Sequence, residues 1–173
     1  MAIIDKLLDD LLRKEGGYSN RKADRGGPTK YGVTLTTLRR HQKEATVDDL
    51  KNLTLDEAKA IFKSEFYFEP KINRLPKSLQ PVVFDISVNS GPTRAINMLQ
   101  QTLVSRGFVV GLIDGKIGDR TISASEKAAC GDLINAIVDR RIVFMRRICI
   151  NDPSQLENLG GWLNRAESFR VKQ

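Results

Sequence analysis

Two carboxylates near the start of the chain have the spacing of a catalytic pair. Glu15 is followed by the glycines of E-G-G-Y, and Asp24 stands nine residues later, just before Gly26 and Gly27. A carboxylic acid that stays protonated near neutral pH can donate a proton to a leaving oxygen, while a second carboxylate orients water or stabilises developing positive charge. These are the two roles that cleavage of a glycosidic bond requires.

The residues before Glu15 predict the helix that would position it. Gly16 and Gly17 can take the left-handed conformation that ends a helix, so Glu15 should occupy the last turn. The carbonyl end of a helix disfavours negative charge, and burial in a cleft would raise the pKa of Glu15 further. Apolar side chains at three- and four-residue spacing predict an amphipathic helix over residues 3–15: Ile3, Ile4, Leu7, Leu8, Leu11 and Leu12.

One alternative is that Glu15 is a solvated helix end without a chemical role. The loop that follows argues against this alternative, because it holds more glycine, threonine and tyrosine than a simple turn requires. Its members are Gly26, Gly27, Thr29, Tyr31, Gly32 and Thr34. The segment therefore predicts a glycine-rich loop that carries functional side chains.

Residues 15–34 closely resemble the signature of glycoside hydrolase family 108, which comprises lysozyme-like N-acetylmuramidases found as phage endolysins and as secretion-associated bacterial muramidases. The resemblance implies that Glu15 is the catalytic acid. Residues 84–92 resemble the family's F-D-x-x-V-N-S-G-P segment. Further segments resemble the predicted peptidoglycan-binding region that follows it: L-Q at residues 99–100, D-G-x-x-G-x-x-T at 114–121 and G-W-L-N-R at 161–165.

The interval between Glu15 and Asp24 also resembles that of the helical phage lysozymes. In those enzymes a Glu, an Asp nine residues on and a nearby Thr form the catalytic set. This resemblance implies catalytic roles for Asp24 and Thr29, with Thr34 as the rival threonine.

Four residues are expected to bind substrate: Tyr31, Thr34, Asn89 and Ser90. Asn89 and Ser90 have two readings. They could hydrogen-bond an acetamido sugar from a cleft wall, or they could cap a helix ahead of Gly91.

Length and periodicity predict an all-α or mainly α protein, and the resemblance implies a lysozyme-like fold. The chain has 173 residues, enough for a sizeable core, and little of it alternates with the period of two typical of strands. Residues 1–92 are expected to form the catalytic muramidase region. Residues 93–173 should form a peptidoglycan-binding-like helical region packed with it into one globular unit.

Helix-capping residues and helix-breaking prolines and glycines predict the other helices and loops. Thr36 should cap a helix that runs to His41, and a capping box of Thr54 and Glu57 should open the next helix. Thr121 or Ser123 should cap a later one. The remaining predicted segments are helices over residues 79–90, 93–106 and 133–150, a loop between Pro70 and Pro76, and a glycine-rich turn over residues 107–121.

No cofactor or metal site is expected. Cys130, Cys149 and His41 are the only cysteines and histidine, which is too few and wrongly spaced for structural zinc. Both cysteines should be buried thiols and His41 a surface residue. For Trp162 we favour a core position over a sugar platform.

The net charge of +7 predicts an anionic partner. Nucleic acid is one candidate, because basic residues cluster at positions 39–43 and 140–147, but acidic residues are interspersed and no nucleic-acid-binding signature occurs. An anionic cell envelope attracts a basic protein through the same long-range field. We therefore expect the envelope as the partner and no nucleic acid.

The function implied by the resemblance is hydrolysis of the β-1,4 bond between N-acetylmuramic acid and N-acetylglucosamine of peptidoglycan, with inversion, by a phage endolysin. Two alternatives remain: a non-catalytic peptidoglycan-binding protein and a muramidase that serves protein secretion.

Acidic residues interrupt the apolar stripe of the N-terminal helix, which is unlike a signal peptide. We expect a monomer that is made in the cytoplasm and acts on the wall in the periplasm, after a holin or other delivery factor has permeabilised the membrane.

Overall fold

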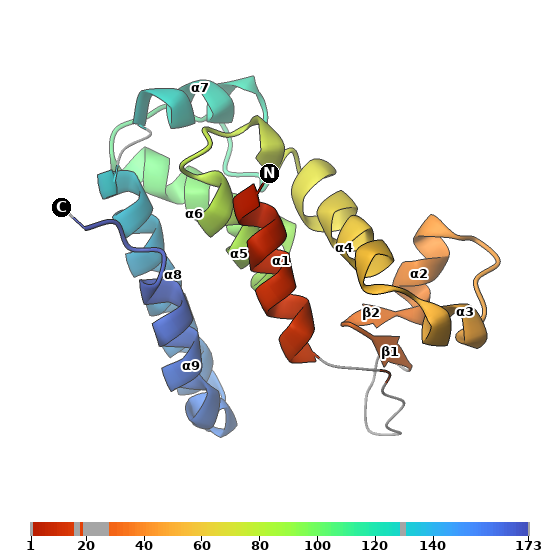
Figure 1. Cartoon of the computed structure of the whole chain (residues 1–173). Coiled ribbons are helices and arrows are strands. Elements are labelled where there is room, and N and C mark those ends of the chain that lie inside the picture. Colours follow the sequence, from red (N-terminus) through yellow and green to blue (C-terminus); the bar gives the residue numbers. More distant parts are fainter. Residues whose placement is uncertain (1, 16–17, 19–27, 129–130, 173) are drawn as a thin grey trace. The chain divides into compact units, whose positions relative to one another are not determined.

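The computed structural model describes residues 2–15, 18, 28–128 and 131–172. Within these residues the chain is mainly α-helical, as predicted, with nine α-helices and one two-stranded antiparallel hairpin (Figure 1). The chain forms two compact units, Met1–Glu65 and Phe66–Gln173. None of the described helices is both long enough and apolar enough to span a bilayer.

The first unit combines a short hairpin with helices, two of which contact its strands. Its elements are α1 (Ala2–Glu15), β1 (Thr29–Lys30), β2 (Val33–Thr34), α2 (Leu35–His41), α3 (Val47–Asn52) and α4 (Leu55–Lys63). Helix α1 contacts α4 through a narrower apolar stripe than predicted. Ile4, Leu8 and Leu12 are buried, whereas Ile3 is 61% exposed.

Capping residues fix where these helices begin. The predicted capping box of α4 is confirmed, since Glu57 N–H donates to Thr54 Oγ1 (3.2 Å) and Thr54 N–H donates to Glu57 Oε2 (2.7 Å). Thr46 and Asp49 form a second capping box at the start of α3, a helix that we did not predict.

The predicted cap of α2 is wrong, because the N-cap is Thr34 and not Thr36. Strand β2 brings Thr34 into the extended conformation that an N-cap needs (φ −83°, ψ 160°). The helix therefore starts as soon as the hairpin ends.

The second unit is built from helices. A π-helix (Ser64–Phe68) leads into it, followed by a 3-10 turn (Ile72–Arg74), α5 (Gln80–Ser90), α6 (Pro92–Ser105), α7 (Asp119–Ala128), α8 (Gly131–Asn151), a 3-10 turn (Pro153–Gln155) and α9 (Leu156–Glu167). The helices predicted over 79–90, 93–106 and 133–150 are confirmed to within two residues. Helices α8 and α9 lie side by side (Figure 1).

The predicted caps of α7 are wrong. The helix begins at Asp119, so Thr121 and Ser123 both lie inside it. Thr121 is buried instead, and its Oγ1 accepts a hydrogen bond from Gln100 Nε2 (3.3 Å).

The predicted turn at D-G-K-I-G is confirmed, and Gln100 of α6 holds it. The Gln100 amide donates to Asp114 Oδ1 and to the Lys116 carbonyl, and it accepts from Gly115 N–H, each at 3.0 Å. Gly115 has φ 71°, and a Cβ there would lie 2.6 Å from Thr93 Cγ2. Only glycine fits this position.

An ionic cluster joins three helices of this unit: Asp85 of α5, Arg141 of α8 and Arg165 of α9. Arg165 donates from Nε (2.8 Å) and Nη2 (2.5 Å) to Asp85 Oδ1. Asp85 belongs to the segment that resembles F-D-x-x-V-N-S-G-P. Its carboxylate holds the three helices together through these ion pairs.

Candidate active site

Glu15 is the last residue of α1, as the glycines after it predicted. Lys59 Nζ lies 2.5 Å from Asp9 Oδ1, and Lys63 pairs with Asp5, so two ion pairs tie α1 to α4. These ion pairs and the buried Ile4, Leu8 and Leu12 hold the body of α1, and Glu15 follows at its end. Asp24, the predicted second carboxylate, lies outside the described residues.

Thr29, Tyr31 and Thr34 come together in the hairpin. Strands β1 and β2 place Thr29 opposite Thr34, and Tyr31 with Gly32 forms the two-residue turn between them. Both turn residues have positive φ, 51° and 76°, which is the pattern of a type I′ turn. A Cβ on Gly32 would lie 3.4 Å from Cζ of Phe62, so the Phe62 ring packs against the turn.

Tyr31 is in an uncommon conformation for a residue with a side chain. The left-handed region costs an L-residue roughly 1–2 kcal/mol, and residues held there cluster at functional sites. Lys30 Nζ lies 5.5 Å from the centroid of the Tyr31 ring. The hairpin tip thus presents an aromatic ring with a cation beside it.

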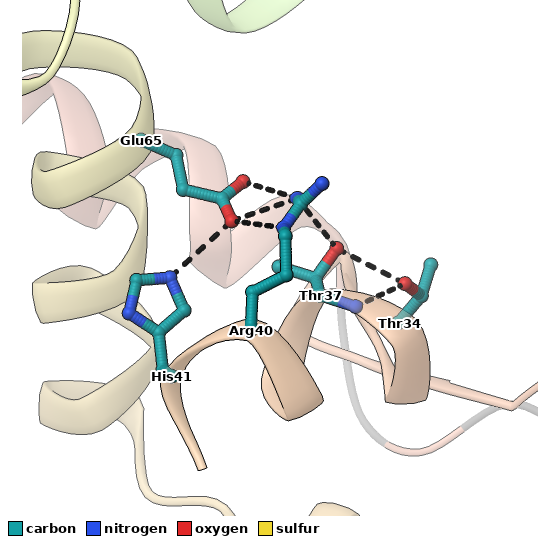
Figure 2. A network of polar contacts seen from close by, with 5 residues as sticks. All are labelled: Thr34, Thr37, Arg40, His41 and Glu65. Atoms are coloured by element: carbon teal, nitrogen blue, oxygen red, sulfur yellow. Dashed lines mark hydrogen bonds and ion pairs between the residues drawn. The ribbon is translucent and has the colours of Figure 1, made fainter. Parts of the chain in front are cut away.

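Thr34 links the hairpin to a polar network on α2 (Figure 2). Its Oγ1 accepts from Thr37 N–H and lies 3.0 Å from Thr37 Oγ1, to which Arg40 Nη2 in turn donates at 3.4 Å. The Thr34 hydroxyl therefore caps α2 and joins the network at the same time.

Glu65 completes this network and is a candidate that sequence reasoning missed. Arg40 donates from Nε to Oε1 (2.9 Å) and from Nη2 to Oε2 (2.8 Å), and His41 Nε2 lies 3.3 Å from Oε1 (Figure 2). The Glu65 side chain is only 12% exposed. With both oxygens occupied, Glu65 fits a positioning role that holds α2 and, through it, the hairpin.

The sequence contains one signal for Glu65: it is the lone carboxylate among the four aromatic residues of segment 62–68. Its partners are at least 24 residues away, so the chain's local pattern does not reveal them. His41 is exposed, as predicted.

Asn89 and Ser90 lie at the end of α5 in the second unit. Asn89 is exposed, and its Nδ2 donates to the Asp85 carbonyl of the preceding helical turn (2.6 Å). Ser90 is partly buried and lines a pocket with Gly91 and Pro92, where α5 turns into α6. The hydrogen bond of Asn89 agrees with a helix-end role, and the position of Ser90 leaves it available to a ligand.

Three other predicted features can be placed. Trp162 on α9 is only partly buried, so a core position for it is wrong. Cys149 is a buried free thiol, as predicted, while Cys130 lies outside the described residues. Among the residues that the structure describes, no group of three or more His, Cys, Asp or Glu side chains could hold a metal ion.

Comparison with known proteins separates the chain into two consecutive segments. Residues 8–91 match the family described as glycosyl hydrolase 108, and residues 94–167 match the predicted peptidoglycan domain. The chain is also similar to a solved structure titled "Structure of Brucella abortus SagA", with a TM-score of 0.72 and 26% identity over 99% of this chain and 98% of that chain. No curated protein matches the chain by sequence.

Proposed function

From the premise that residues 8–91 belong to the glycosyl hydrolase 108 family, we propose that the protein cleaves the β-1,4 bond between N-acetylmuramic acid and N-acetylglucosamine. The chain is a peptidoglycan hydrolase of the glycoside hydrolase class. The observation that carries the finer proposal is the place of Glu15, at the end of a helix that two ion pairs anchor.

In the proposed reaction Glu15 donates its proton to the glycosidic oxygen as the bond to the anomeric carbon breaks. Asp24 stabilises the positive charge that develops on the sugar or orients the water that attacks it. The attacking water gives its proton to the Asp24 carboxylate and leaves a hydroxyl on the new reducing end. We propose inversion at the anomeric carbon, for which a separation of roughly 6.5–9.5 Å between the two carboxyl groups is expected.

The hairpin supplies the supporting contacts in this proposal. Thr29 and Thr34 are cross-strand neighbours, and Tyr31 presents its ring at the turn. An aromatic face suits the apolar face of a pyranose, and a threonine hydroxyl can donate to or accept from an acetamido group. Glu65 and Arg40 keep α2, and hence Thr34, in place.

The test is the identity of the reducing end that the enzyme creates. Purified sacculi are digested, the products are reduced with borohydride, and the fragments are identified by mass spectrometry. Reduced N-acetylmuramic acid at the new ends is the expected result. Reduced N-acetylglucosamine would show that the other glycosidic bond is cut and would overturn the proposal.

We also propose that the biological role is that of a phage endolysin, a monomer that reaches the wall with the help of a holin or another delivery factor. The resemblance to phage endolysins supports this role, and the +7 charge supports attraction to an anionic envelope. Co-expression with a holin should cause rapid lysis of the producing cell, whereas the protein alone should not. Local wall remodelling without lysis, even with the holin, would favour the alternative role in protein secretion.

A further inference from the structure

A groove between α6 and α8 in the second unit carries three arginines. Its volume is about 570 Å³, within the range of small-molecule sites. None of the described residues that line it is acidic. We call it the arginine groove, after Arg94, Arg140 and Arg147.

Both helices face this groove with one stripe of side chains. Helix α6 contributes Arg94, Asn97, Met98 and Gln101. Helix α8 contributes Arg140, Val143, Phe144 and Arg147. Each set has the i, i+3, i+4, i+7 spacing that places residues on one helical face. The packing of α6 against α8 therefore builds the groove from regular structure and not from a loop.

Two of the three arginines, Arg140 and Arg94, are held by contacts to neighbouring side chains. Arg140 donates from Nε to Thr102 Oγ1 (3.1 Å) and from Nη1 to Gln101 Oε1 (3.2 Å), while its Nη2 makes no hydrogen bond to a described residue. Arg94 Cζ lies 4.7 Å from the centroid of the Phe144 ring. Within the described ranges none of the three arginines forms an ion pair with a carboxylate, so their charge is open to a ligand.

We propose that the arginine groove binds the carboxylate groups of peptidoglycan stem peptides, an inference that rests on the proposed function. The planar guanidinium fork matches a carboxylate in two parallel hydrogen bonds. Most of the groove falls within residues 94–167, the segment that matches the predicted peptidoglycan domain. In peptide-bearing peptidoglycan the N-acetylated sugars are uncharged, and the negative charge is on the peptide.

Two further features of the groove fit a peptide. Met98 and Val143 give it apolar surface that suits alanine side chains, next to the cations that suit the carboxylates. Ser90, which the sequence predicted as a substrate contact, lines the same groove. Recognition of the peptide is thus assigned to the second unit, while Glu15 and the hairpin belong to the first.

The test compares two ligands that differ only in charge. The full-length protein is titrated calorimetrically with a disaccharide–tripeptide monomer, which lacks the bond to be cut, and with the same monomer after its carboxyl groups have been amidated. Charge-assisted hydrogen bonds contribute about 1.5–3 kcal/mol each, so the amidated monomer should bind at least roughly tenfold more weakly. Equal affinities would overturn the proposal.

Matched variants locate the binding. Arg140→Gln and Arg147→Gln should each weaken binding of the free-acid monomer roughly tenfold or more. Arg146→Gln removes the same charge from the same helix but lies outside the groove, and its Kd should equal that of the wild type. Arg147 makes no hydrogen bond or ion pair with a described residue, so its variant should fold even if the loss of Arg140 disturbs packing. Unchanged Kd in folded Arg147→Gln and Arg140→Gln would overturn the groove as the site.

Two more measurements separate the possible failures. Inorganic phosphate is titrated as well, and binding as tight as that of the tripeptide monomer would mean that the groove selects charge alone, which also overturns the proposal. Release of reducing ends from sacculi is measured in the same preparations. Folded variants that lose monomer binding support the groove, whereas a wild-type protein that binds the monomer and cleaves nothing overturns the proposed function only.

Discussion

Asp85 Oδ2 lies 2.7 Å from Arg141 Nη2, and each side chain is 1% exposed. The pair joins α5 to α8, and Arg165 of α9 contacts the other Asp85 oxygen. Burial lowers the pKa of the Arg141 guanidinium below its ordinary value, and the charge of Asp85 opposes this shift. One carboxylate therefore compensates two guanidinium groups inside the second unit.

Removal of this carboxylate should strongly destabilise the protein. Asp85→Ala leaves Arg141 buried and without a counter-ion, so the free energy of unfolding should fall by about 3–5 kcal/mol, measured by urea denaturation. Asp139→Ala is the control, because Asp139 pairs with Arg170 at the surface and should contribute at most about 1 kcal/mol. Similar losses in the two variants would mean that the buried cluster is not a main source of stability.

Glu15→Gln should abolish cleavage and leave the fold intact. Glutamine is nearly isosteric with glutamic acid but cannot donate the proton, and loss of a general acid costs about 10²-fold or more in turnover. Turnover is measured as reducing ends released from sacculi, with circular dichroism as the check on folding. Glu44→Gln, an exposed acid elsewhere in the first unit, should behave as the wild type. Residual turnover within a few-fold of the wild type would remove Glu15 from the mechanism.

Local signals explain which parts of the fold were predictable. The capping box of Thr54 and Glu57 and the apolar periodicity of α1, α5, α6 and α8 are properties of consecutive residues, and these helices were found. The hairpin was not, because strands of two residues have no periodicity to detect. The start of α2 depends on that hairpin, since the segment T-L-T-T offers several threonines and only Thr34 leaves a strand.

The same limit applies to the site. Thr29, Tyr31 and Thr34 are close in sequence, so their proximity could be expected from the loop alone. Glu65 and Arg40 are 25 residues apart, and the two stripes of the arginine groove lie on different helices. Such pairings depend on which helices pack together, and a single helical pattern carries no information about its partner.

The D-G-K-I-G turn should give the stability a measurable pH dependence. The hydrogen bond from Gln100 and that from Lys116 N–H lower the pKa of Asp114 below its ordinary value. A depressed pKa in the folded state contributes stability that is complete above the unfolded-state pKa of about 3.9 and is lost as the pH falls through the folded-state pKa. Asp114→Asn should therefore reduce the loss of stability below about pH 4.

This expectation is checked by thermal unfolding between roughly pH 2 and pH 7. Glu126→Gln, which removes an exposed acid from α7, controls for net charge. If the loss of stability below about pH 4 changes equally in the two variants, the hydrogen bond between Gln100 and Asp114 does not link the stability to protonation of Asp114.

Tyr31 allows strain and function to be separated. Tyr31→Asn converts the turn to Asn-Gly, the pair that a type I′ turn prefers, so the free energy of unfolding should rise by up to about 1 kcal/mol. The variant loses the aromatic ring, and kcat/KM on sacculi should fall roughly tenfold if the ring contacts sugar, since a tenfold change corresponds to about 1.4 kcal/mol.

Gly32→Ala is the opposite case. It keeps the ring but forces a Cβ into the left-handed conformation against Phe62, so it should lower the free energy of unfolding by roughly 1–2 kcal/mol. A Tyr31→Asn protein that is more stable and fully active would show that the ring makes no productive contact, and one that is less stable would show that the turn is not strained.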